Sequence, residues 1–576
     1  MKHTKHLFAL FAVLATLPSA ASAQYFQSGG LWYNVLSSTE HTVEVTQGNG
    51  TNFYHGSITI PPTVTYGGTT YDVVALGEYA FFYATLSSVT IPTSVTQIKG
   101  LCFYSANGPA AITVPASVTD IGEMAFAANN MTAINVDSDN PSYTSVDGML
   151  FSKDTSVLYE CPLGKSGVIA LPQSTRHIAV TAFAWCHSLT GVTLHEGLAS
   201  IGYGAFVNCT SLDNVVIPST VTSLKSNLFE GCSALNNLAV ASGNSHYYMD
   251  GTMLYSIGTD TLLSCHKSAD TVVLPATLRA VGGFGGNTDI RHVQLPDSVT
   301  TLLENAFEVS TLQSITLPRR MDFIDEYAFF YCESLSHIDL PSVLDSMGAG
   351  CFAGCTRLAS IALPDGLRVV PQDAFFACEH LTQVTWGDAI EVVDSFAFGG
   401  CAITELLLPP TLRVVRNGAF NGYYDGTIRR VVFSAPVDTI EAETFYGQPL
   451  RSIWFENSQP PVATTFEGAY GPIDNAAVDS IIIPCGSLGN WLADSYWGHF
   501  ASCYHEACNG IDDVPGTDAK VYSIGGRIVV EGTDGEPVRI YDIMGRPLKT
   551  NNLPLATGIY FVRVGDRPAR KVAVLK

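Results

Sequence analysis

The hydrophobic residues of this chain recur in one phrase along most of its length. Three apolar positions are separated by two variable positions and then by one, as in Leu-x-x-Ile-x-Leu, and a proline usually follows. The last apolar residue of the clearest phrases is Leu317, Leu340, Leu363, Trp386 or Leu408, so the steps are 23, 23, 23 and 22 residues. A fixed period of this length predicts a solenoid, because each coil must bury its apolar face against its neighbours.

A second register keeps the same period. Each phrase also contains an Ala-Phe pair, and the phenylalanines of the clearest run are Phe307, Phe329, Phe352, Phe375 and Phe398. The apolar positions of Leu-x-x-Ile-x-Leu should point inward from a short strand, and the proline should end that strand because it lacks an N–H donor. We expect the phenylalanine to fill the opposite wall of the coil.

This repeat resembles a known family. Its Ala-Phe, Cys, Ser-Leu and Ile-x-Leu-Pro positions are similar to the BspA-like, Treponema-type leucine-rich repeat of bacterial surface proteins, over residues 57–483. The resemblance implies a leucine-rich repeat solenoid with a parallel β-sheet on one face, exposed on the bacterial surface. Members of that family are implicated in adhesion to host matrix, other bacteria or glycans, and the repeat itself specifies no ligand.

Two delays in the repeat match each other. The next strand is late after Val136 and again after Val240, and each delay contains an Asn, an Asp-Gly, an aromatic residue and a Cys. Equivalent residues, such as Asn140 and Asn244, lie 104 positions apart. The pattern predicts a duplicated four-coil module that carries a β-hairpin insert. The inserts could form a binding rim or could simply decorate the solenoid.

The first 23 residues are typical of an export signal. Lys2 and Lys5 precede an apolar stretch at 7–17, and Ala-Ser-Ala at 21–23 is a small-residue cleavage site. Eleven apolar residues are too few to cross about 30 Å of hydrocarbon. We therefore expect cleavage after Ala23, an exported protein, and no integral membrane segment in the mature chain.

The remaining segments differ in composition from the repeats. Residues 24–56 are predicted to form a β-rich N-terminal cap, residues 484–510 a C-terminal cap, and residues 511–519 a linker. Residues 520–576 predict a small Ig-like β-sandwich of short strands. Their phrases VRIYDIMGRPL and GIYFVRV are similar to the C-terminal sorting domain of the type IX secretion system. That resemblance implies contact with the type IX machinery, then attachment to the outer membrane surface or release.

The net charge and the absence of two catalytic motifs limit the possible functions. The chain has 29 Lys and Arg residues and 52 Asp and Glu residues, so its formal net charge is −23. This negative charge disfavours nucleic acid and anionic membranes as partners. The chain contains no His-Glu-x-x-His and no Gly-x-Ser-x-Gly motif. We therefore predict no enzyme, no catalytic residue and no cofactor.

Ten of the fourteen cysteines fall into two groups. Seven follow the repeat phenylalanine by three residues and are predicted to be buried structural thiols. These are Cys186, Cys209, Cys232, Cys332, Cys355, Cys378 and Cys401. In the C-terminal cap, Cys485, Cys503 and Cys508 are better candidates for disulfides.

Three further motifs favour structure over ligand binding. The stretch 503–508, Cys-Tyr-His-Glu-Ala-Cys, lacks a well-placed second ligand pair for zinc. The stretch 137–140, Asp-Ser-Asp-Asn, is more typical of a turn than of a calcium loop. The glycines of 282–286 lack the spacing of a phosphate loop and predict a tight bend. No metal site is therefore predicted.

The outward positions of the last strands differ from the others. Most outward residues are small or polar, but here they are Arg429, Arg430, Arg451 and Trp454. Arginine and tryptophan are enriched in binding hot spots, so these four residues are the candidate ligand-binding site. They could instead pack against the C-terminal cap.

These observations predict a non-enzymatic cell-surface adhesion or interaction protein. Its ligand would be a host or bacterial surface protein or a polysaccharide. The alternative is a surface protein that captures glycans for nutrient uptake.

Overall fold

The computed structural model describes residues 25–47, 53–258, 260–265, 270–422, 426–464, 470–474, 476 and 478–507, and strands between 520 and 574. The expected signal peptide and linker lie outside the described residues. The chain divides into two compact units, residues 1–450 with 462–477, and residues 451–461 with 478–576.

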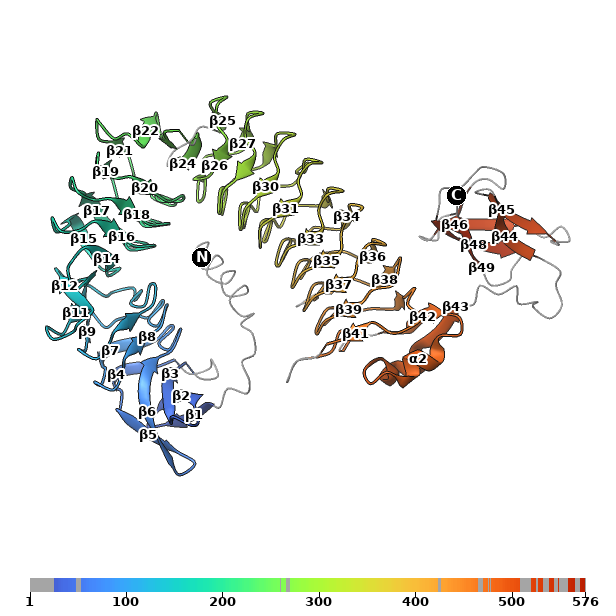
Figure 1. The fold of residues 1–576 in the computed structure, drawn as a ribbon, viewed down its shortest axis with the longest axis horizontal. Coiled ribbons are helices and arrows are strands. Elements are labelled where there is room, and N and C mark those ends of the chain that lie inside the picture. Colours follow the sequence, from blue (N-terminus) through green and yellow to red (C-terminus); the bar gives the residue numbers. More distant parts are fainter. Residues whose placement is uncertain are drawn as a thin grey trace. The chain divides into compact units, whose positions relative to one another are not determined.

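The Leu-x-x-Ile-x-Leu phrases of the first unit form one series of short parallel strands, as the repeat predicted. They lie side by side in register, so that Ile112 is the partner of Ile134 and Leu408 that of Phe433 (Figure 1). The series comprises β4 (His55–Thr59), β7 (Thr85–Thr90), β9 (Ala111–Val114), β11 (Ala133–Val136), β15 (Ser166–Ala170), β17 (Ser188–Thr193), β19 (Asn214–Ile217), β21 (Asn237–Val240), β25 (Thr271–Val273), β27 (His292–Gln294), β29 (Ser314–Thr316), β32 (Ser360–Ala362), β34 (Gln383–Thr385), β36 (Glu405–Leu408) and β38 (Arg430–Phe433).

A second series of parallel strands forms another face of each coil, and most of these strands have only two residues. Their apolar residue points inward, as Ile98 and Val393 do, both fully buried. The series comprises β6 (Thr69–Leu76), β8 (Gln97–Ile98), β10 (Asp120–Ile121), β14 (Val157–Glu160), β16 (His177–Ile178), β18 (Ser200–Ile201), β20 (Ser223–Leu224), β24 (Thr261–Cys265), β26 (Ala280–Val281), β28 (Thr301–Leu302), β30 (Phe323–Ile324), β31 (Ser346–Met347), β33 (Val369–Val370), β35 (Val392–Val393), β37 (Val414–Val415), β39 (Thr439–Ile440) and β41 (Val462–Ala463). The sequence analysis did not predict this second face.

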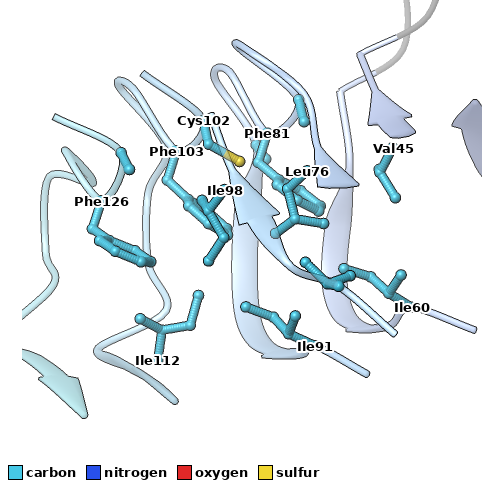
Figure 2. Close-up of a cluster of buried hydrophobic side chains, with 14 of the residues drawn as sticks. Val45, Ile60, Leu76, Phe81, Ile91, Ile98, Cys102, Phe103, Ile112 and Phe126 are labelled. Atoms are coloured by element: carbon cyan, nitrogen blue, oxygen red, sulfur yellow. The ribbon is translucent and has the colours of Figure 1, made fainter. Parts of the chain in front are cut away.

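The Ala-Phe segments form a third wall made of turns, which we call the turn wall. Their phenylalanine rings stack from coil to coil inside the solenoid, and Figure 2 shows Phe81, Phe103 and Phe126 in the first coils, with Ile98 and Cys102 packed beside them. The ring centroids of Phe81 and Phe103 lie 4.8 Å apart, and the two planes differ by 6°. The backbone links the coils as well, since the N–H of most of these phenylalanines donates to a carbonyl of the next coil, for example Phe81 to Cys102 at 2.9 Å.

Both predicted hairpins are present. In the first, β12 (Tyr143–Val146) and β13 (Met149–Ser152) are antiparallel, and in the second, β22 (Tyr247–Asp250) and β23 (Met253–Ser256) are. The first turn is Asp147-Gly148, where both residues have positive φ, of 49° and 73°. Such a pair matches the twist of a two-residue hairpin.

The matching asparagines anchor the two inserts in the same way. The Asn140 amide donates to the carbonyls of Pro115 and Val118, and its oxygen accepts the N–H of Tyr143 at 2.8 Å. Asn244 makes the same bonds to Pro218, Val221 and Tyr247. Equal contacts at positions 104 residues apart are what a duplicated module predicts.

The segment before the coils is an antiparallel meander. Its strands are β1 (Tyr25–Ser28), β2 (Leu31–Ser37) and β3 (Thr42–Thr46), and β5 (Thr63–Tyr66) joins it through β6. Strand β3 pairs in parallel with β6, which continues the second series of strands. The meander therefore shares a sheet with the first coils.

The second unit begins with β40 (Ser452–Trp454), β42 (Ser480–Pro484) and β43 (Tyr504–Ala507), which are parallel. Between the last two lie helix α2 (Leu488–Ala493) and the 3-10 helix η1 (Trp497–Cys503). Fully buried Trp491 and Trp497 pack on Phe455, with ring centroids 4.9 and 5.5 Å from it.

Residues 520–574 form two antiparallel sheets, one of β44 (Lys520–Ile524) and β45 (Arg527–Glu531), the other in the order β47-β46-β48-β49. The latter strands are β46 (Val538–Asp542), β47 (Pro547–Leu548), β48 (Gly558–Val564) and β49 (Arg570–Val574). Among the described residues, no helix is long and apolar enough to span a membrane.

Candidate interaction surface

The strands separate inward residues from outward ones in the way the repeat predicts. In β36, Leu406 and Leu408 are buried, whereas Glu405 and Leu407 are exposed. The inward side chains hold the coils together, so their chemistry is restricted to apolar types. The outward side chains carry no such restriction, and any ligand specificity of this face must come from them.

Arg430 stands on the outward side of β38, and Arg429 immediately precedes the strand. Arg429 is exposed and Arg430 is half-buried, while Val431 and Phe433, which alternate with outward positions, are buried. Arg430 lies directly across from Glu405 in the register of β36 and β38. A carboxylate therefore stands on the same face beside this arginine.

Arg451 and Trp454 belong to the second unit, so the structure does not bring all four residues into one described site. Arg451 is exposed and Trp454 is half-buried, while its neighbours Ile453 and Phe455 are buried. In register, Trp454 stands beside Ile482 of β42. The tryptophans of the C-terminal segment pack on the inward Phe455, which leaves Trp454 on the opposite side of the strand.

The seven repeat cysteines are buried free thiols, as predicted. Six of them donate to the carbonyl of the phenylalanine one coil earlier, at S···O distances of 3.0 to 3.2 Å. Burial raises the pKa of the Cys378 thiol to about 12, so that it stays protonated and remains a donor. These cysteines therefore act as links between coils and have no reactive thiolate.

The prediction for the C-terminal cysteines was partly wrong. Cys485 is disulfide-bonded, which agrees with it, but Cys503 is a free thiol. The Cys503 sulfur instead donates to the carbonyl of Val478 at 3.5 Å. Cys508 lies outside the described residues.

The metal and phosphate motifs have structural roles where they are described. Asn140, at the end of the 137–140 stretch, is fully buried and uses its side chain on backbone groups, and Lys153 donates to the carbonyl of Ser138 at 2.9 Å. The described residues hold no group of three His, Cys, Asp or Glu side chains arranged for a metal. Gly283 packs against the backbone of Ser264, where a Cβ would come within 2.3 Å of the Ser264 Cα, so this position requires glycine because two coils approach closely.

The sequence analysis missed a buried carboxyl at the first insert. The Glu160 side chain accepts a hydrogen bond from the N–H of Phe126 at 3.1 Å. In most other coils, the equivalent phenylalanine N–H donates to a backbone carbonyl of the next coil. The pKa of Glu160 is raised to about 8, chiefly by burial; the hydrogen bond from the Phe126 N–H lowers this pKa, and nearby Glu123 raises it by a smaller amount. A lone glutamate at the end of a strand carries no sequence signal for this role.

Comparison with known proteins places the solenoid in a family. The family described as "BspA type Leucine rich repeat region (6 copies)" matches residues 74–165, 154–259, 255–375 and 346–466. The chain is thus a leucine-rich repeat protein, and it belongs to the BspA-type leucine-rich repeat family. That family consists of repeat proteins and indicates no catalytic activity.

Several solved structures are similar. A leucine rich cell surface protein from Faecalibacterium prausnitzii is 25% identical, over 63% of this chain and 95% of that one, with a TM-score of 0.37. A leucine-rich repeat protein from Bacteroides ovatus is 20% identical, over 84% and 99%, with a TM-score of 0.36. The pneumococcal vaccine antigen PcpA is 19% identical, over 69% and 95%, with a TM-score of 0.35. No curated protein matches this chain.

Proposed function

We propose that this protein is exported and displayed on the cell surface, where it binds a protein or glycan ligand through the outward side chains of its solenoid. Membership of a family of leucine-rich repeat surface proteins supports an interaction or adhesion role. The observation that carries the proposal is the separation of side chains on the strands. Inward positions are uniformly apolar, while outward positions range from Ser314 to Arg429 without any change in the coil.

The same proposal assigns the other segments. Residues 1–23 are the signal peptide, residues 24–56 and 484–510 shield the two ends of the solenoid, and residues 511–519 link it to the last segment. Residues 520–576 act as the type IX sorting domain. Solenoid ends need shielding because a terminal coil has no neighbour to cover its apolar face.

For the ligand site we propose Arg429, Arg430, Arg451 and Trp454. The exposed guanidinium of Arg429 suits a carboxylate of a protein or an acidic glycan, and the Trp454 ring suits the face of a sugar. Capture of soluble glycans for uptake is the second candidate, and the outward position of Trp454 is the observation that favours it.

The test is a glycan and matrix-protein array probed with the full chain, followed by affinity measurements on variants. Trp454→Ala should weaken binding by about 2 kcal/mol or more, as hot-spot aromatics do. Replacing Arg429 and Arg430 by Ser should weaken it further and reduce its dependence on salt. Leu407→Ala, at an exposed outward position on β36, is the matched control.

The melting temperature of the variants distinguishes ligand binding by these residues from packing against the C-terminal cap. Outward side chains should not hold coils together, so the variants should melt close to the wild type. A large loss of stability with binding unchanged would show that these residues dock the C-terminal cap, and the proposed site would then be wrong. Binding of soluble oligosaccharides with no affinity for surface proteins would favour the nutrient-uptake alternative.

A further inference from the structure

The turn wall carries a second group of aromatic side chains, separate from the internal phenylalanine column. We call it the aromatic patch, and its rings are Tyr327, Phe330, Tyr331, Phe376 and Phe396. Phe330 stands edge-on to both tyrosines, with centroids 5.4 Å from Tyr327 and 4.6 Å from Tyr331. Both tyrosines are half-buried, so the patch reaches the surface of the solenoid.

Three of these rings, those of Tyr327, Tyr331 and Phe396, stand on backbone that favours glycine. Tyr327 and Tyr331 have φ values of 55° and 51°, and the equivalent positions of the next coil are Gly350 and Gly354. A bulky residue at positive φ is strained. A Cβ on Gly350 would come within 2.5 Å of the Tyr327 ring, and one on Gly354 within 2.7 Å of the Tyr331 ring. The glycines therefore let the two rings lie along the surface of the neighbouring coil.

Exposed carboxylates lie near the two tyrosines, and none forms an ion pair with a lysine or arginine of the described residues. The exposed ones are Glu304 and Glu326 near Tyr327, and Glu333 and Glu379 near Tyr331. Burial first, and then Glu333 and Glu379, raise the pKa of Tyr331 to about 12, which shows how close these acids stand to the ring. The patch thus combines electron-rich rings with exposed carboxylates that form no ion pair among the described residues.

We propose that the aromatic patch and the four exposed carboxylates beside it bind a basic, extended segment of a partner protein. Arginine or lysine side chains of that segment would lie over the rings and pair with the carboxylates. Cations are attracted to aromatic faces, and the planar guanidinium also stacks on them. An uncharged or acidic partner would leave these carboxylates unbalanced, and a second copy of this chain, with a net charge of −23, would be repelled.

The spacing of the coils suits such a segment. Along the phenylalanine column, consecutive rings lie 5.1 Å apart from Phe329 to Phe352 and 5.5 Å apart from Phe352 to Phe375. Side chains on one side of an extended peptide repeat every ~7 Å. Three alternate cations therefore span roughly 13 Å, enough to reach from Glu333 across two coils to Glu379. This face is distinct from the arginine and tryptophan site, and the inference would hold if that site bound nothing.

The test uses the full chain and a defined probe. A fluorescent ten-residue peptide of alternating arginine and serine is titrated by anisotropy, with the same peptide carrying glutamine for arginine as a reference. The double variant Glu333→Gln/Glu379→Gln removes two charges at the patch without a change in volume. Asp345→Asn/Asp365→Asn is the matched control, because it removes two exposed charges elsewhere on the same solenoid.

We expect the arginine peptide to bind and the glutamine peptide not to bind. The patch variant should bind the arginine peptide at least ten-fold more weakly, and the control less than two-fold more weakly. Tyr331→Phe should retain affinity, because it keeps the ring. Tyr331→Leu should lose about five-fold, as the loss of one cation–π contact predicts, and circular dichroism checks that both variants are folded.

Three results would overturn the proposal. The first is equal binding of the two peptides. The second is equal weakening by the patch and control variants, which would mean attraction to net charge alone. The third is self-association of the chain that Glu333→Gln/Glu379→Gln abolishes in sedimentation, because a second copy would then be the occupant.

Discussion

The phenylalanine column allows a quantitative test of how the coils hold together, and Phe352→Ala is the most informative substitution. Phe352 is fully buried, and its ring stacks on Phe329 and Phe375 with planes tilted by only 7° and 2°. Burial of such a side chain contributes about 1.5–3 kcal/mol. Each stacked contact adds roughly 0.5–1.5 kcal/mol.

The cavity left by the substitution cannot collapse. The coils on either side are fixed by the backbone, since Phe329 N–H donates to Cys351 and Phe352 N–H to Ala374, at 2.8 and 2.9 Å. The two remaining rings therefore cannot close the gap. We expect a loss of about 3–5 kcal/mol, the usual cost of Phe→Ala in a core.

Guanidinium unfolding measures the global loss, and amide hydrogen exchange measures it coil by coil. Exchange should accelerate most in the coils beside residue 352, because each coil is stabilised by its nearest neighbours. Phe53→Ala is the control, since this side chain is 37% exposed. A loss below 1 kcal/mol for Phe352→Ala, or a loss equal to that of the control, would refute the argument that stacked rings couple the coils.

Three further predictions follow from buried polar groups and from the last segment. Cys355→Ser should cost less than Phe352→Ala, roughly 1–2 kcal/mol in denaturant unfolding, because the shorter hydroxyl makes a poorer hydrogen bond in the buried site. If a mass comparison of reduced and oxidised protein showed these cysteines bridged, the buried-thiol assignment would be wrong. The Glu160 pKa of about 8 lies above its unfolded value, so its protonated form stabilises the fold and that contribution is lost as pH rises from about 4.5 to about 8. Glu160→Gln should remove this loss, because glutamine does not ionise. The free energy of unfolding of the variant should therefore exceed that of the wild type by a margin that grows up to pH 8. Parallel curves of unfolding free energy against pH would contradict this prediction. Deletion of residues 520–576 should leave the protein in the periplasm with a folded solenoid, whereas normal surface display would rule out the sorting role.

The repeat, its period and both inserts were predictable because they depend on local patterns that many coils repeat. The Leu-x-x-Ile-x-Leu phrase predicted short strands with inward apolar side chains, and the phenylalanine register predicted that this ring fills the opposite wall of the coil. The 104-residue offset predicted two equivalent hairpins. Buried free thiols followed from the same register, since a residue three places after an inward ring lies inside the coil.

The second series of strands was not predictable in this way. A strand of two residues, such as β8 or β33, is too short to show a period, and only hydrogen bonds to neighbouring coils define it. The free thiol of Cys503 was missed for a related reason. Three cysteines close in sequence suggest pairing, but the positions of the sulfur atoms decide which of them can form a bond.

The sequence alone therefore determined the coil, because each coil needs the same apolar residues at the same places to bury its core. It did not determine which outward residues gather on one surface. Tyr331 and Glu379 are separated by 48 positions, and two turns of the solenoid bring them to the same face. The role of Glu160 also depends on the tertiary structure. At the first insert its carboxyl takes the place of the coil carbonyl that would otherwise accept the Phe126 N–H. Periodicity is a local property of the chain, whereas charge balance and backbone hydrogen bonding across a surface are decided only when the coils stack.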